Sequence, residues 1–198
     1  MAKVIADITM SLDGYVTGPG ADPQHGLGDA EELHAWVMDQ DPVDSEILAR
    51  STEASGAVVM GRRLFDVVDG PDGWNESMGY GAQEAGTPPF FVVTHRPPAD
   101  VRLARDLGLR FTFVDGLAEA IEGARAAATA GDVVIMGGGD VIGQAIAGGL
   151  ADELVIHLAP MVLGGGTPLF KAGARQLYRQ RDVRPSSHAV HVTYERVP

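Results

Sequence analysis

The sequence predicts an α/β protein with a mostly parallel central sheet, flanking helices and a C-terminal antiparallel hairpin. Short, continuous apolar runs at residues 57–60 and 90–93, bounded by Gly and Pro, are typical of strands buried on both faces. Segments with helical periodicity alternate with such runs, which is the pattern of an α/β domain. Near the end, apolar and polar residues alternate on both sides of Pro185-Ser186-Ser187, which indicates the hairpin.

The elements follow in order along the chain. Residues 4–10 form the first expected strand, and residues 29–40 a helix whose first turn holds Glu31 and Glu32, where the helix dipole favours acidic side chains. The later expected elements are helices at 44–54, 117–130 and 140–147, strands at 133–136 and 153–158, and hairpin strands at 176–183 and 188–197.

Composition limits the function. A chain of 198 residues that is 45% hydrophobic is expected to form one domain over residues 1–198. The absence of Cys excludes disulfides and cysteine-ligated metals, and the scattered His residues predict no metal site. A net charge of −12 argues against a nucleic-acid partner. Without a signal-peptide pattern or an apolar run of roughly 20 residues, we expect a cytoplasmic protein with no membrane partner.

A glycine-rich turn follows the strand expected at residues 133–136. Glycines allow the backbone to approach a ligand, and the free N–H groups of the next helix favour an anion such as a pyrophosphate. The alternative is a tight connection without a ligand. The spacing departs from the common dinucleotide-binding fingerprint, because Gly143 comes one place late. The residues of this turn are Gly137, Gly138, Gly139, Asp140 and Val141.

Two basic turns follow the strands at 57–60 and 90–93. They are Gly61-Arg62-Arg63-Leu64 and Thr94-His95-Arg96. The carboxyl ends of strands are where α/β sheets bind ligands, and arginine suits phosphate groups. For either turn alone, solvated surface arginines are the alternative. Together with the glycine turn they predict a dinucleotide with an extra phosphate, which favours NADPH over NADH.

Five motifs in this order resemble a known family. They are Ser11-Leu12-Asp13-Gly14-Tyr15, Val59-Met60-Gly61-Arg62-Arg63, Val93-Thr94-His95-Arg96-Pro97, Val134-Ile135-Met136-Gly137-Gly138-Gly139 and Leu163-Gly164-Gly165-Gly166-Thr167-Pro168-Leu169-Phe170. The chain resembles the dihydrofolate reductase-like fold and, more closely, the reductase (C-terminal) domain of bifunctional riboflavin-biosynthesis proteins.

This resemblance implies NADPH binding. Arg62, Arg63, Thr94, His95 and Arg96 are then expected at the adenosine 2′-phosphate, and residues 137–141 at the pyrophosphate, with a cis peptide between Gly137 and Gly138. Leu64 stands where dihydrofolate reductases often have a phosphate-binding Thr, which leaves only its backbone N–H for that role. The resemblance also implies a homodimer that pairs through residues 163–170 and the hairpin at 176–197.

On the substrate side, we expect Asp13, Glu32 and His157 to act in catalysis and Trp36 to bind the substrate. Glu31 is an alternative to Glu32, and a helix-start acid beside a Trp also fits dipole stabilisation with core packing. Asp13 also fits a simple Asp-Gly turn. His157 aligns with a pterin-contacting Thr of the reductases, and a hydrogen-bonded core histidine is its alternative.

The segment 66–89 contains no Arg or Lys to anchor a folate tail. A tail carboxylate would instead meet the acidic residues Asp66, Asp69, Asp72, Glu76 and Glu84. The resemblance implies an NADPH-dependent reductase that transfers hydride to a small planar, pterin- or pyrimidine-like substrate, and this segment argues against dihydrofolate as that substrate. The alternative function is a non-catalytic NADPH-binding sensor or dimerisation module.

Overall fold

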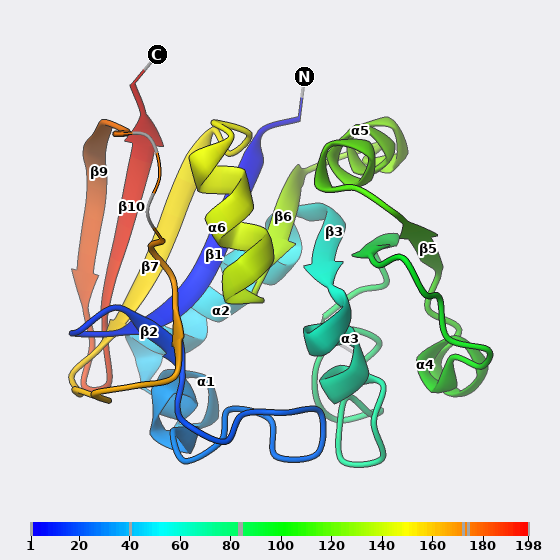
Figure 1. Ribbon diagram of the computed structural model, residues 1–198, viewed down its shortest axis with the longest axis horizontal. Coiled ribbons are helices and arrows are strands. Elements are labelled where there is room, and N and C mark those ends of the chain that lie inside the picture. Colours follow the sequence, from blue (N-terminus) through cyan, green and yellow to red (C-terminus); the bar gives the residue numbers. More distant parts are fainter. Residues whose placement is uncertain (1, 40, 83–84, 172, 174, 198) are drawn as a thin grey trace.

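The computed structural model describes residues 2–39, 41–82, 85–171, 173 and 175–197. Its centre is an eight-stranded sheet of order β5-β4-β3-β6-β1-β7-β10-β9 (Figure 1). Neighbouring strands from β5 to β7 pair in parallel, whereas β10 is antiparallel to both β7 and β9. The predicted α/β class with its antiparallel C-terminal hairpin is confirmed. The strands are β1 (Val4–Ser11), β3 (Ser55–Gly61), β4 (Phe90–Val93), β5 (Phe111–Val114), β6 (Asp132–Met136), β7 (Glu153–Ala159), β9 (Tyr178–Pro185) and β10 (Val190–Arg196).

Helices cover both faces of the sheet. In Figure 1, α5 and α6 lie in front of it and α2 lies behind β1 and β6. A small second sheet pairs β2 (Tyr15–Thr17) with β8 (Thr167–Pro168). Among the described residues, none of the helices has the length and apolar character needed to cross a membrane. The helices are η1 (Glu31–His34, a 3₁₀ turn), α1 (Ala35–Met38), α2 (Pro42–Ala54), α3 (Arg62–Val68), α4 (Arg102–Leu107), α5 (Leu117–Ala127) and α6 (Gly139–Ala147).

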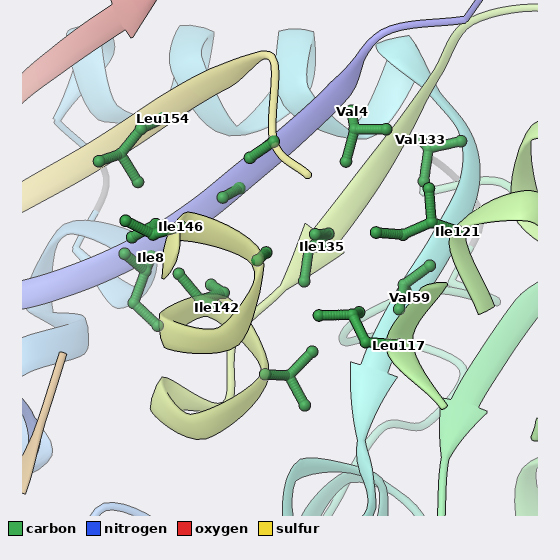
Figure 2. Close-up of a cluster of buried hydrophobic side chains, with 14 of the residues drawn as sticks. Val4, Ile8, Val59, Leu117, Ile121, Val133, Ile135, Ile142, Ile146 and Leu154 are labelled. Atoms are coloured by element: carbon green, nitrogen blue, oxygen red, sulfur yellow. The ribbon is translucent and has the colours of Figure 1, made fainter. Parts of the chain in front are cut away.

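The main core lies between the sheet and the helices α5 and α6 (Figure 2). Side chains alternate across a strand, so Val4, Ala6, Ile8 and Met10 of β1 all face these helices. Ile142 of α6 is fully buried against them. The other side chains of β1 therefore point to the opposite face, and three of them are polar.

An aromatic cluster fills the opposite face beneath β3 and β4. Trp74 and Tyr80, from the long segment before β4, pack edge-to-face at 5.4 Å between ring centroids, and both contact Phe90. Arg102 of α4 donates to the carbonyl oxygens of Asp69 and Trp74 at 2.9 and 2.8 Å. These contacts hold the long loop to the sheet. Glu84 of the predicted acidic set lies outside the described residues.

The prediction of one continuous helix at 29–40 is wrong. The structure has the 3₁₀ turn η1 and the single turn α1, and a separate helix, α2, begins at Pro42; Gln40 lies outside the described residues. The residue before a proline is disfavoured in helical conformation, and Asp41 is extended, with φ −68° and ψ 134°. The short elements α3, α4, β5, β2 and β8 were not predicted, and the helix expected at 117–130 ends at Ala127.

Candidate functional site

The loops that follow the parallel strands gather at one edge of the sheet, the lower edge in Figure 1, because these strands run in the same direction. This edge holds the glycine turn after β6, the arginine turn after β3 and the threonine turn after β4. The sequence predicted that these three turns meet, and the strand order β4-β3-β6 makes them neighbours.

The glycine turn forms a narrow backbone cradle. Gly137 and Gly138 have φ of +59° and +79°, a region that favours glycine. A Cβ on Gly139 would lie 2.6 Å from a methyl carbon of Val16, and one on Gly61 would lie 2.8 Å from Val141. The peptide between Gly137 and Gly138 is trans, so the predicted cis bond is wrong; the two left-handed glycines turn the chain instead.

The N-terminus of α6 opens onto this cradle. Its N-cap, Gly138, offers no side-chain acceptor, and its carbonyl accepts only the first helical bond, from the N–H of Ile142 at 3.1 Å. The first N–H groups of the helix therefore lack intrahelical partners and suit an anion. Asp140 in this first turn is paired with Lys171, and Arg63 lies 4.0 Å from it.

The two neighbouring arginines differ in their contacts. Arg62 donates from Nε to Asp66 at 2.7 Å and from Nη1 to the carbonyl oxygen of Arg96, so it joins the two basic turns. The Arg63 side chain is 82% exposed. Arg62 therefore links the two basic turns, whereas the Arg63 guanidinium is exposed beside Asp140.

The remaining predicted cofactor residues border the same edge. Thr94 is buried and its hydroxyl accepts the N–H of Arg96 at 3.1 Å. His95 is exposed, with Nδ1 3.6 Å from Asp115, and Arg96 is also exposed. The side chain of Leu64 packs against the cradle, 2.9 Å from where a Cβ on Gly137 would lie. The narrow cradle and the neighbouring cations fit a dinucleotide phosphate.

Asp13 joins two loops on the substrate side. It accepts the Ser11 hydroxyl at 2.7 Å and the backbone N–H groups of Leu163 and Gly164 at 3.1 and 2.7 Å. These hydrogen bonds, that of Ser11 foremost, lower the pKa of Asp13 to about 2. Both carboxylate oxygens are thus engaged by the protein itself.

The other predicted substrate residues separate in the structure. Glu31 and Glu32 are exposed in η1, where Leu33 is the residue that turns inward. Trp36 is buried, donates from its indole to the Thr9 hydroxyl at 2.9 Å, and lies 4.1 Å from His157 between ring centroids. The structure brings Trp36 and His157 together and leaves the two glutamates at the surface.

His157 belongs to a buried chain of acids and imidazoles that sequence reasoning missed. Its Nε2 lies 3.0 Å from Asp7 of β1, and its Nδ1 lies 2.7 Å from Nδ1 of His191 of β10. Nε2 of His191 lies 2.7 Å from Asp44 of α2, whose other oxygen lies 2.9 Å from His188. The available signal was Asp7, a carboxylate within an apolar strand, because a charge in such a strand needs a partner.

The contacts of the buried Asp44 and the partly buried Asp7 favour their ionised forms. Burial acts to raise the pKa of Asp7, but the charge and hydrogen bond of His157 and the hydroxyl of Ser51 outweigh it, so that this pKa is lowered. Burial acts in the same way on Asp44, and hydrogen bonds from Ser186, His188 and His191 lower its pKa. The pKa of His188 is raised, mainly by its hydrogen bond to Asp44.

A cavity of about 240 Å³ lies between α2 and the sheet, next to this chain. Asp7, His157 and His191 line its inner wall, and Arg50, Asp182 and Arg184 are among its other lining residues. A larger cavity, about 660 Å³, lies on the α6 face and has a mostly apolar lining that includes Leu169, Phe170 and Tyr194. Only the smaller cavity touches the acid–imidazole chain.

Comparisons with solved structures find the same fold. A putative riboflavin biosynthesis protein from Shewanella sp. PV-4 is 23% identical, with full coverage of both chains and a TM-score of 0.70. A pyrimidine reductase-like protein from Corynebacterium diphtheriae is 17% identical, with a TM-score of 0.65 over all of this chain and 92% of that one.

A diaminohydroxyphosphoribosylaminopyrimidine deaminase/5-amino-6-(5-phosphoribosylamino)uracil reductase from Thermotoga maritima is 13% identical, with a TM-score of 0.62 over 99% of this chain and 57% of that one. No curated protein matches the chain. The family model described as the RibD C-terminal domain matches residues 2–192. The chain therefore belongs to the RibD C-terminal domain family, and the predicted resemblance is confirmed.

Proposed function

We propose that this protein is an NADPH-dependent reductase that transfers hydride to a small planar, pyrimidine- or pterin-like substrate other than dihydrofolate. The observation that carries the proposal is the glycine cradle at the N-terminus of α6, with the exposed guanidinium of Arg63 nearby. The family supports a reductase, and one structural relative is named a 5-amino-6-(5-phosphoribosylamino)uracil reductase.

We assign each residue a role that its contacts support. When bound, NADPH supplies the hydride. The N–H groups at the start of α6 hold the pyrophosphate, and Arg63, with Thr94, His95 and Arg96 beside it, holds the 2′-phosphate. Arg62 positions the two turns through Asp66 and the Arg96 carbonyl. Asp13 orients the loop at Leu163 and Gly164 over the substrate side.

We place the substrate near Trp36 and His157. Glu32, or Glu31, contributes to catalysis only if η1 moves toward these residues, because both acids are exposed. We also propose a homodimer, because Phe170, Leu177 and Val183 expose apolar side chains along the loop and hairpin expected to pair.

Turnover separates this function from the alternative, a non-catalytic NADPH-binding sensor. NADPH oxidation is measured across a panel of aminopyrimidines, pterins, quinones and nitro compounds. Oxidation coupled to loss of an aminopyrimidine or pterin supports the reductase. Tight NADPH binding without oxidation in any of these mixtures contradicts the reductase and favours the sensor.

A further inference from the structure

The chain Asp44–His191–His157–Asp7 has a proton count that follows from its geometry. Three hydrogen bonds of 2.7, 2.7 and 3.0 Å join the four groups in a row. Each bond needs one proton between its two atoms. Two neutral imidazoles carry one N–H each and two ionised carboxylates carry none, which supplies only two protons. The three bonds therefore require a third proton on these four groups.

The surroundings retain this proton. Asp44 is fully buried and His157 and His191 are almost so, and the four groups with the extra proton keep a net charge of −1. Burial acts to raise the pKa of Asp7, but its contacts with His157 and Ser51 outweigh burial and lower this pKa, whereas burial lowers the pKa of His191. The titratable and charged groups around the chain include Arg50, Glu46, Asp182, Arg184, His188, Asp39, Asp41 and His34.

One end of the chain reaches solvent. The second oxygen of Asp44 meets Nδ1 of His188, and Nε2 of His188 lies 3.2 Å from Asp39, whose side chain is 63% exposed. An imidazole accepts a proton at one nitrogen and releases one from the other. Water therefore exchanges protons with the Asp44 end of the chain through His188, whereas a proton taken between His157 and Asp7 is replaced at Asp7.

The other end faces the cavity under α2 and adjoins the cofactor cradle. The carbonyl of Asp7 accepts the N–H of Gly137 at 3.3 Å, so the backbone of Asp7 contacts the cradle while its side chain lines the cavity with His157. A volume of about 240 Å³ accommodates one aromatic ring with small substituents.

We propose that Asp7, His157, His191 and Asp44 store one exchangeable proton, and that an acceptor bound in the cavity under α2 takes up this proton when it is reduced. The inference rests on the proposed function for its hydride. Hydride from the dihydronicotinamide adds to one atom of an acceptor C=N or C=C bond, and the electron pair of that bond moves to the other atom. This second atom takes the proton from the His157–Asp7 pair, and water restores it at Asp7, whose side chain is 19% exposed.

The stored proton is tested on the cofactor-free protein, so that the test is independent of turnover. Long-range ¹H–¹⁵N spectra of histidine-labelled protein at pH 8, with ¹³C spectra of the Asp carboxyls, count the protons on the four groups. We expect three protons, one above the count for neutral rings and ionised acids. Two protons, with both rings neutral and both acids ionised, would overturn the proposal.

Two matched variants test what holds the proton. Asp44→Asn keeps the shape of the chain but removes its buried charge, so loss of the third proton is expected at a pH at least one unit lower than in the parent. Asp41→Asn removes a charge three residues away that caps α2 and accepts from Ser187, outside the chain. This control is expected to keep the third proton, and equal titration of the two variants would contradict the coupling.

The probe 5,6-diaminouracil tests the acceptor end. Its binding is expected to shift the His157 and His191 signals and to leave those of His25, which lies on an exposed loop beside Asp22, unchanged. If the four groups carry three protons but saturating probe does not shift the His157 signal, the placement of the acceptor is overturned. The proposed function is tested separately by NADPH binding. A protein that stores the proton but does not bind NADPH would contradict the proposed function and not the stored proton.

Discussion

Gly138→Ala tests the backbone cradle at a position where the folded protein has room for a methyl group. The nearest heavy atom to a Cβ on Gly138 is the Gly61 nitrogen at 3.9 Å, so no clash is expected. The cost to folding is then that of placing Ala at φ +79°, about 1–2 kcal/mol. For a chain of this length, this lowers Tm by roughly 2–8 °C.

The effect on the cofactor is expected to be larger than the effect on folding. The added methyl group occupies the space through which the pyrophosphate approaches the N–H groups of α6. Loss of one charge-assisted hydrogen bond costs about 1.5–3 kcal/mol, which weakens NADPH binding roughly ten-fold or more. Binding is measured by fluorescence titration, and stability by thermal unfolding without cofactor.

Gly108→Ala is the matched control. Gly108 ends α4 with φ +67° and has no atom within 4 Å of its Cβ position, so its folding cost is similar, and it lies outside the cradle. Unchanged NADPH affinity in Gly138→Ala, or an equal loss in Gly108→Ala, would refute the assignment of the cradle as the pyrophosphate site.

Three further predictions concern substrate, pH and assembly. Dihydrofolate is expected to give a kcat/KM below about 10⁴ M⁻¹s⁻¹ in steady-state kinetics; a higher value would identify a folate reductase. The pKa of His188 is raised by folding, so its stabilisation is full below about pH 6.5 and is lost as the pH rises through the folded pKa. The free energy of unfolding, measured with urea, should therefore differ most between the parent and His188→Gln at low pH. A difference that does not change with pH would contradict this role of His188. Light scattering should give about twice 20.8 kDa, and a monomer mass would exclude the homodimer.

The meeting of the glycine turn with the two basic turns was predictable because its signals are local. The strands before Gly61, Thr94 and Gly137 are continuous apolar runs, and the residues that follow each run are adjacent in sequence. Their meeting required only that parallel strands end at one edge of the sheet. The trans peptide at Gly137 and the role of Arg62 as a link to Arg96 depended on contacts that no short pattern contains.

The acid–imidazole chain was not predictable in the same way. Asp7 and His157 are 150 positions apart, and Asp44 and His191 are 147 apart. Asp44 stands at the start of the helix expected at 44–54, and its contacts with His188 and His191 depend on where α2 packs against the hairpin. Pro42 begins α2 and separates it from α1, and Glu32 lies exposed in η1.

Cofactor preference tests the central claim most directly. Titration of the protein with NADPH and NADH, repeated with Arg63→Ala and with the exposed β9 control Arg179→Ala, isolates the contribution of the 2′-phosphate. We predict that NADPH binds at least about ten-fold more tightly than NADH, that Arg63→Ala removes most of this difference, and that Arg179→Ala keeps it. Equal affinity for the two cofactors in the parent protein would contradict the account.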